Sequence, residues 1–307
     1  MTRQAITSDH ERTDTRRAGG VQPGEHGVAA KVDRAELHTA VLPTPAGNSV
    51  KVIERVGSGA PLIFLHSGVG SAGEWRQVFD LWPDGRRLVA VDAYGVGAGP
   101  GTAGRRTLDD FADQVLAVGE HVGEHIHLVG FSWGGATALH IGVTAPDVLA
   151  SLTVIEPEVY GLLTPADGPA YATIVALRDR WRDLVRADRW YEAYEAFIDF
   201  YNGPGSFAGW PAGRREQFLD GQRRRGDLWD VLFEGPVTAE TLEAVPLPVH
   251  VVEGSATSAV DHTICELVLR HVARPEHSLI EGAGHMIPLT HAAALTRALV
   301  ARVTGLR

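Results

Sequence analysis

The sequence predicts an α/β fold with a mostly parallel, doubly wound sheet and an inserted helical cap. Two observations carry this prediction. Short apolar runs alternate with helical segments over residues 34–157 and 246–307, which is the rhythm of parallel strands joined by crossover helices. Residues 158–245 break this rhythm, because they contain several helical segments and no strand-like run. We therefore expect a core built from the first two segments and a cap, residues 158–245, over the carboxyl edge of the sheet.

The expected strands follow from two kinds of pattern. Residues 36–42 and 50–56 flank a segment that contains Pro, Gly and Asn, which predicts a hairpin. Continuous apolar runs are typical of strands that are buried on both faces. Such runs lie at 61–65 and 87–91, and further strands are expected at 126–129, 152–155, 249–252 and 278–280.

Helices are expected where apolar residues recur at helical spacing. Residues 107–122 form an amphipathic segment that begins with Thr107 and Asp110, the spacing of a capping box. A closing helix is expected over 292–303. Within the cap, helical segments lie at about 170–186, 188–201, 212–225 and 238–244.

Composition and charge exclude several classes of protein. The chain has 307 residues, a formal net charge of −10 and no basic stripe, so we expect no binding to nucleic acid or to an anionic membrane. No apolar run is long enough to span a bilayer. The single cysteine, Cys265, excludes an internal disulfide and fits a reducing compartment. Its apolar neighbours predict an inert thiol in a buried helix.

The first 33 residues differ from the rest of the chain. They are polar and glycine-rich and show no periodicity, so we expect a disordered tail over residues 1–33. The apolar core of a secretory signal is missing from this segment. We expect a cytoplasmic protein that is either a monomer or a homodimer.

The pentapeptide Gly130-Phe131-Ser132-Trp133-Gly134 is the most informative motif. An apolar run precedes it and small helix-forming residues follow, which predicts a strand, a sharp turn and a helix with Ser132 at the apex. A serine in a tight turn of a nucleotide-binding loop is the alternative, but no glycine-rich phosphate signature follows a strand here. Ser132 is therefore the candidate nucleophile, and it needs a base and an acid that orients the base.

His285 is the candidate base, because it follows the last expected strand in a glycine-rich loop. Two carboxylates compete for the role of the acid. Glu156 ends the strand before the cap, and Asp261 lies in the loop after the strand at 249–252. That loop carries Thr257 where an aspartate would be expected, which favours Glu156 and keeps Asp261 as the alternative.

The oxyanion hole and the substrate pocket are expected from two other segments. The backbone amides of Gly68, in the loop after the strand at 61–65, and of Trp133 are the candidate oxyanion donors. Aromatic residues recur at helical spacing on one face of the cap helix at 188–201. Some of these rings are expected to line an apolar or aromatic pocket, although a plain packing role remains open. The pocket candidates are Ser67, Val69, Trp190, Tyr194 and Phe197.

Over about residues 36–305 the chain resembles the α/β-hydrolase superfamily. The supporting motifs are His66-Ser67-Gly68-Val69-Gly70-Ser71, Asp92-Ala93-Tyr94-Gly95-Val96-Gly97, the pentapeptide around Ser132, Ile155-Glu156-Pro157 and Gly282-Ala283-Gly284-His285-Met286. The order Ser132, Glu156, His285 matches the family's order of nucleophile, acid and base. The chain departs from the family at Ser67, where glycine is usual, and at Thr257. The resemblance implies the α/β-hydrolase fold and a nucleophilic serine.

The sequence therefore predicts a serine hydrolase that needs no cofactor and no metal. It would act on a carboxylic ester, lactone or thioester of a small apolar or aromatic molecule through an acyl-enzyme. A lyase, cyclase or tailoring enzyme of bacterial secondary metabolism that uses the same pocket is the alternative, since the fold does not fix the reaction. A small-ligand binding protein without catalysis is the third possibility.

Overall fold

The computed structural model describes residues 36–44, 49–92, 107–123, 125–225, 227 and 229–305. The expected tail and most of the expected hairpin turn lie outside the described residues. Residues 93–97, which make up most of the motif that begins with Asp92, also lie outside the described residues.

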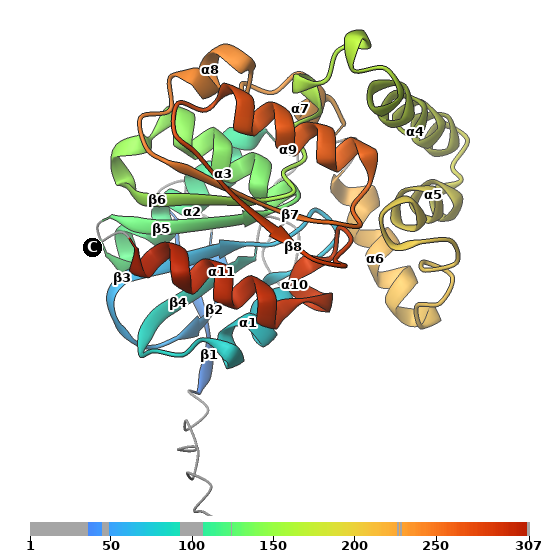
Figure 1. Cartoon of the computed structure of the whole chain (residues 1–307). Coiled ribbons are helices and arrows are strands. Elements are labelled where there is room, and N and C mark those ends of the chain that lie inside the picture. The colour runs from blue at the N-terminus through green and yellow to red at the C-terminus, as the bar shows by residue number, and fades with distance from the viewer. Residues whose placement is uncertain are drawn as a thin grey trace, which may run out of the picture. The chain divides into compact units, whose positions relative to one another are not determined.

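One eight-stranded sheet forms the centre of the described chain (Figure 1). Its spatial order is β1-β2-β4-β3-β5-β6-β7-β8. The first two strands pair as the expected antiparallel hairpin, β2 is also antiparallel to β4, and every other neighbouring pair is parallel. The mostly parallel α/β fold is thereby confirmed. The strands are β1 (Leu37–Pro43), β2 (Ser49–Arg55), β3 (Ser58–Leu65), β4 (Arg86–Asp92), β5 (Ile126–Phe131), β6 (Leu149–Ile155), β7 (Val249–Gly254) and β8 (Pro275–Ile280).

Helices cover both faces of this sheet, so it is doubly wound. Along β3, Ile63 and Leu65 join one buried cluster and Leu62 and Phe64 the other, because successive side chains of a strand point to opposite faces. Full burial of such an aliphatic side chain contributes roughly 1.5–3 kcal/mol. The first cluster includes α2 (Leu108–Val122), α3 (Trp133–Thr144) and α9 (Ala259–His271). The second includes α1 (Arg76–Leu81), α10 (Ile287–Thr290) and α11 (Ala292–Thr304).

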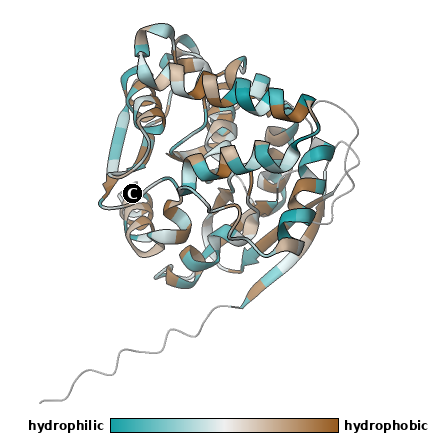
Figure 2. Ribbon diagram, turned by 90° about the vertical axis from the view of Figure 1, so that its right-hand side faces the viewer, coloured by the Kyte–Doolittle hydropathy of each residue, from teal (hydrophilic) through white to brown (hydrophobic). Residues whose placement is uncertain are grey.

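The insertion between β6 and β7 is helical, as its sequence predicts. Its helices are α4 (Pro169–Arg186), α5 (Trp190–Asn202), α6 (Ala212–Arg225), α7 (Trp229–Phe233) and α8 (Ala239–Glu243), with 3₁₀ turns at Tyr160–Leu162 and Pro165–Asp167. The segment 238–244 predicts α8, but the sequence did not predict α7 or the 3₁₀ turns, which no apolar period marks. Hydrophilic and hydrophobic residues alternate along the helices on the side shown in Figure 2, in keeping with amphipathic packing. Core and insertion belong to one compact unit.

Two local predictions are also confirmed. Thr107 caps α2 in a capping box with Asp110. Cys265 is fully buried in α9, where the thiol is a small apolar group. None of the described helices is both long enough and apolar enough to cross a membrane.

Candidate active site

Ser132 sits at a strained turn between β5 and α3. Its φ of 56° and ψ of −118° lie outside the regions that L-residues favour. Three backbone hydrogen bonds hold this conformation: the Ser132 amide donates to the carbonyl of Ile155 (2.9 Å), and the Ser132 carbonyl accepts from the amides of Ala136 (3.1 Å) and Glu158 (3.2 Å). Strain of this kind costs on the order of 1–3 kcal/mol and persists where the surroundings enforce it.

The two glycines of the motif allow the close packing that the turn requires. A Cβ on Gly130 would lie 2.1 Å from the carbonyl oxygen of Gly134. A Cβ on Gly134 would lie 2.5 Å from the carbonyl oxygen of Leu65, at the end of β3. Both contacts are with backbone, so neither can relax by moving a side chain. The motif therefore brings the start of α3 directly against the end of β3.

His285 connects Ser132 to an acid. Its Nε2 lies 3.1 Å from Oγ of Ser132, and its Nδ1 lies 2.7 Å from Oε2 of Glu156. The ring packs between Phe131 and Tyr201, with ring centroids 5.1 and 4.4 Å away. The three polar side chains are buried and come from segments that follow β5, β6 and β8. The structure thus brings together the predicted nucleophile, base and favoured acid.

Glu156 is held by the loop that follows β7. Its Oε1 accepts from the amide of Gly254 (2.8 Å), and its Oε2 accepts from the hydroxyl of Thr257 (2.8 Å). Thr257 stands where the family's pattern would place an aspartate, and its hydroxyl instead supports the carboxylate on the neighbouring strand end. The backbone of Glu156 also has a positive φ of 40°, a second strained position beside Ser132.

Asp261 is a second carboxylate near the same imidazole. Its Oδ2 lies 3.7 Å from Nδ1 of His285 and accepts a hydrogen bond from Ser258 (2.7 Å). The sequence predicts a loop at Asp261, and this prediction is wrong: Ser258 caps α9, so Asp261 lies in the first turn of that helix. From this position Asp261 lies farther from Nδ1 of His285 than Glu156 does.

These carboxylates set the protonation of the site. Burial alone would lower the pKa of His285, but Asp261, Glu156 and Glu158 outweigh burial and raise this pKa to about 9. Burial raises the pKa of Asp261 to about 7, and Glu156 adds to this rise although His285 opposes it. These carboxyl groups therefore stabilise the positive charge that His285 carries once it has accepted a proton.

Three side chains of this site are also close enough together to hold a metal ion. The ligand atoms of Glu156, Asp261 and His285 lie within 4.8 Å of one another. The same atoms already hydrogen-bond to one another, because Nδ1 of His285 faces Oε2 of Glu156. A metal ion held there would have to replace the proton between these two groups. These three side chains therefore suit proton transfer between His285 and the carboxylates at least as well as they suit metal binding.

The loop after β3 brings Gly68 next to Trp133. A Cβ on Gly68 would lie 3.4 Å from Cβ of Trp133, so the two residues predicted to donate to the oxyanion lie next to each other. Ser67 is buried and turned away from the pocket, because its amide and hydroxyl both donate to the buried Glu74 (2.9 and 2.7 Å). Burial raises the pKa of Glu74, and the hydrogen bonds from Ser67 oppose the rise. Glu74, which the sequence analysis missed, thereby positions this loop.

A pocket of about 60 Å³ opens beside Ser132, between the loop after β3 and the cap helices. Of the predicted pocket residues, Val69, Tyr194 and Phe197 line it. Ser67 and Trp190 do not. Trp190 instead packs on Trp181 and Tyr194. The lining residues are Gly68, Val69, Trp133, Glu158, Trp181, Tyr194, Phe197, Gln222, Trp229 and Leu232.

Among the described residues, Glu158 is the one carboxylate in this lining, and it was not a predicted site residue. Its Oε1 accepts from the hydroxyl of Tyr160 (3.0 Å), which is also hydrogen-bonded to the hydroxyl of Tyr201. Burial raises the pKa of Glu158, while His285 and the hydroxyls of Tyr160, Ser132 and Tyr201 oppose the rise. No periodicity or motif marks Glu158, because its position depends on the fold of the cap.

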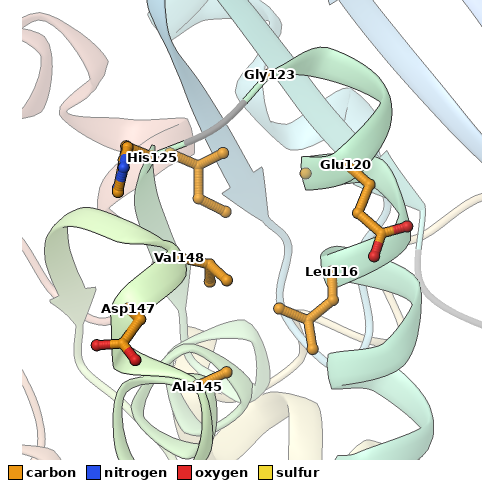
Figure 3. A pocket seen from close by; sticks show the side chains of 9 residues that line it. Leu116, Glu120, Gly123, His125, Ala145, Asp147 and Val148 are labelled. Carbon is orange, nitrogen blue, oxygen red and sulfur yellow. The ribbon is translucent and has the colours of Figure 1, made fainter.

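A larger pocket, of about 370 Å³, lies elsewhere (Figure 3). It opens between the end of α2, the start of β5 and the end of α3, which is the amino edge of the sheet. Ser132 follows the other end of β5, so this pocket is not part of the site around it. Its walls are mostly apolar and carry no nucleophile paired with a base. It is lined by Leu116, Gly119, Glu120, Gly123, His125, Ile126, Ala145, Asp147 and Val148.

The fold and the Ser–His–acid arrangement define the class of the protein as an α/β-fold hydrolase. A family model described as "Alpha/beta hydrolase family" matches residues 62–298, so the chain belongs to this family. The match covers the sheet from β3 onward, the insertion and the loop of His285.

Relatives and solved structures agree with this assignment. An esterase from Mycobacterium tuberculosis is 22% identical over 276 residues, which cover 87% of each chain. The acetyltransferase component of an acetoin cleaving system from Pseudomonas putida is 34% identical over 98 residues, but these cover 32% of this chain and only 26% of that protein. A carboxylesterase from Bacillus subtilis shares the fold, with a TM-score of 0.65, 20% identity and coverage of 88% and 92% of the two chains.

Proposed function

We propose that the protein is a serine hydrolase of carboxylic esters, lactones or thioesters of small molecules. The observation that carries this proposal is the continuous set of hydrogen bonds from Ser132 through His285 to Glu156, at the carboxyl edge of the sheet. A serine hydroxyl becomes a useful nucleophile when a base of this kind can take its proton. The esterase-like relatives support the same reaction class.

In the proposed reaction, Oγ of Ser132 attacks the substrate carbonyl while Nε2 of His285 takes the hydroxyl proton. Glu156 orients the imidazole and stabilises its positive charge. The amides of Gly68 and Trp133 donate to the oxyanion of the tetrahedral intermediate. His285 then protonates the leaving group, and afterwards it removes a proton from the water that hydrolyses the acyl-enzyme.

The test is covalent labelling. A fluorophosphonate probe should label the wild-type protein, and Ser132→Ala should abolish the labelling. A short p-nitrophenyl ester should give a burst of nitrophenol, as expected for an acyl-enzyme. Labelling that persists in Ser132→Ala would overturn the assignment of the nucleophile. Turnover without Ser132, or ligand binding without a burst, would favour the lyase, cyclase or binding alternatives.

The remaining assignments belong to the same proposal. We place the protein in the cytoplasm, since its one cysteine is a buried free thiol. We treat residues 158–245 as a cap over the core of 34–157 and 246–307, since helices of this insertion line the pocket beside Ser132.

A further inference from the structure

The pocket beside Ser132 has two features that a purely apolar acyl pocket does not need. Aromatic rings from three cap helices surround it, and a single carboxylate, Glu158, forms part of its wall. The rings are those of Trp181 in α4, Tyr194 and Phe197 in α5, and Trp229 in α7. They pack edge to face against one another, so their orientations are fixed by mutual contact.

Glu158 lies where it can meet a substrate. A Cβ built on Gly68 would lie 4.0 Å from Oε2 of Glu158, and the Glu158 amide donates to the carbonyl of Ser132 (3.2 Å). Tyr160 holds the other carboxylate oxygen, Oε1. The second oxygen, Oε2, therefore lies beside the loop of Gly68, in the wall of the pocket, and the hydroxyls of Ser132 and Tyr201 also interact with this carboxyl group. The side chain is almost fully buried, with 4% of its surface exposed.

The charge around this space is strongly one-sided. Glu74, Glu156, Glu158 and Asp261 are all buried and all act electrostatically on His285. Over the described part of the chain, Lys and Arg contribute nothing to the pocket lining and form no ion pair with Glu158. One imidazolium therefore faces four carboxyl groups. Burial raises the pKa of Glu74, Glu158 and Asp261, and a cation bound in the pocket would oppose that rise, so the pocket favours a cationic substrate over an anionic one.

Aromatic faces and a carboxylate together are the groups that recognise an ammonium ion. The face of Trp, Tyr or Phe attracts a cation, most strongly where the cation has lost its water. A buried carboxylate without a cationic partner is unfavourable, and a ligand can supply that partner. The size of the pocket also suits such a group. A single water needs about 10–15 Å³, so about 60 Å³ holds a few heavy atoms, such as a dimethylammonium group.

We propose that this pocket is a subsite for a protonated amine that the substrate carries close to its reacting carbonyl. Glu158 pairs with the ammonium group, and the rings of Trp181, Tyr194, Phe197 and Trp229 surround it. This inference rests on the proposed function for its orientation toward Ser132, and it names a substrate class, cationic amino esters, that the proposed function leaves open.

A pair of ligands of equal shape tests the subsite without any catalysis. 2-(Dimethylamino)ethanol is a cation at pH 7, and 3-methylbutan-1-ol replaces its nitrogen with carbon. Quenching of tryptophan fluorescence or calorimetry gives both dissociation constants. We expect the amine to bind at least about tenfold more tightly, a difference of about 1.4 kcal/mol. An equal or stronger affinity of the neutral alcohol for the wild-type protein overturns the proposal, and this comparison requires no variant to fold.

Glu158→Gln removes the charge and keeps the shape, so it should abolish the preference for the amine. The matched control is Asp220→Asn, which removes one negative charge from an exposed ion pair on the cap, between Asp220 and Arg223. The Asp220→Asn protein should still bind the amine more tightly than the neutral alcohol. A preference that survives in Glu158→Gln would mean that general surface charge attracts the amine, and the proposed role of Glu158 would be rejected.

A second pair of compounds connects the subsite to the reaction. The p-nitrophenyl esters of 3-(dimethylamino)propanoate and 4-methylpentanoate have the same shape, and kcat/KM should favour the cationic ester by about tenfold or more. If the amine binds more tightly but kcat/KM does not favour the cationic ester, the bound ammonium group does not lie where a productive substrate would carry it. That result would overturn the proposal. Loss of hydrolysis of both esters with the binding preference retained would instead count against the proposed function alone.

Discussion

Two carboxylates face the same nitrogen of His285, and their contacts differ. Glu156 approaches Nδ1 to 2.7 Å and receives hydrogen bonds from Gly254 and Thr257 that fix its orientation. Asp261 remains at 3.7 Å and is bonded to Ser258. An acid that orients a base must hold the ring in one position. The geometry therefore gives the orienting role to Glu156 and an electrostatic role to Asp261.

The two roles predict different effects when the charge of each carboxylate is removed. Glu156→Gln should lower kcat by roughly 10³–10⁴-fold, the size of effect seen when an orienting acid becomes an amide. Asp261→Asn should lower kcat by less than about tenfold. It should also move the rise of kcat/KM to lower pH, because Asp261 contributes to the raised pKa of His285. Steady-state kinetics on one p-nitrophenyl ester from pH 6 to 9.5 measure both effects. The reverse ranking of the two variants would assign the acid to Asp261.

Single residues also show where sequence reasoning stops. The sequence located Ser132 and His285, since each follows a strand within a motif that leaves little choice of position. It also identified Ser67 and Thr257 as departures from the family's pattern. Only the fold shows what offsets them: Glu74 binds Ser67, and Thr257 supports Glu156. Such partners are far apart in sequence or unmarked by any motif, so no local pattern could have predicted them.

At the scale of elements, the turn between β5 and α3 depends on close backbone contact. Gly134→Ala would place a Cβ 2.5 Å from the carbonyl oxygen of Leu65. We expect it to lower the free energy of unfolding by about 2–4 kcal/mol, because neither backbone can move without disturbing β3 or α3. Urea denaturation monitored by circular dichroism gives the value.

The control for Gly134→Ala is a glycine with free space. Gly213 lies in the exposed first turn of α6, and a Cβ there would have no heavy atom within 4 Å. Gly213→Ala should leave stability unchanged or raise it by about 0.4–1 kcal/mol, since alanine favours helix and restricts the unfolded chain. If the Gly134→Ala protein were as stable as the Gly213→Ala protein, the inference that α3 packs closely against β3 at Gly134 would be wrong.

The elements themselves differ in how well the sequence predicts them. Strands such as β3 and β5 are buried on both faces and are therefore continuous apolar runs that can be recognised directly. The long cap helices α4 and α5 show their period over 18 and 13 residues. By contrast, α7 has five residues, and tertiary contacts of Trp229 with Tyr160 and Trp181 hold it in place. Its position in the pocket wall is therefore a property of the fold.

At the scale of the whole molecule, buried titratable groups give stability a pH dependence. His127 and His250 lie within the sheet, and burial lowers the pKa of each to about 4, with a smaller contribution from nearby positive charge. Below pH 6.5 the unfolded chain binds protons at these histidines more readily than the folded chain does, so these two groups favour unfolding in acid.

The buried carboxyl groups of the site act in the opposite direction over the same range. Burial raises the pKa of Glu74, Glu158 and Asp261, so above about pH 4 the folded chain binds protons there that the unfolded chain has lost. Their contribution to stability falls as pH rises, while that of His127 and His250 increases. Below pH 6.5 the two effects oppose each other, so the clearest slope of stability with pH is expected above it.

Above pH 6.5 the raised pKa of His285 determines the direction of that slope. The folded chain keeps this proton up to about pH 9, whereas an unfolded histidine loses it near 6.5. The stabilisation is fully present below pH 6.5 and is lost as pH rises through 9. We expect the free energy of unfolding to fall by on the order of 1–3 kcal/mol between pH 6.5 and 9. Urea titrations at pH 6.5, 7.5 and 9 measure the slope. His285→Asn should reduce it and His291→Asn should leave it unchanged, whereas a constant or rising wild-type stability would exclude a raised pKa for His285.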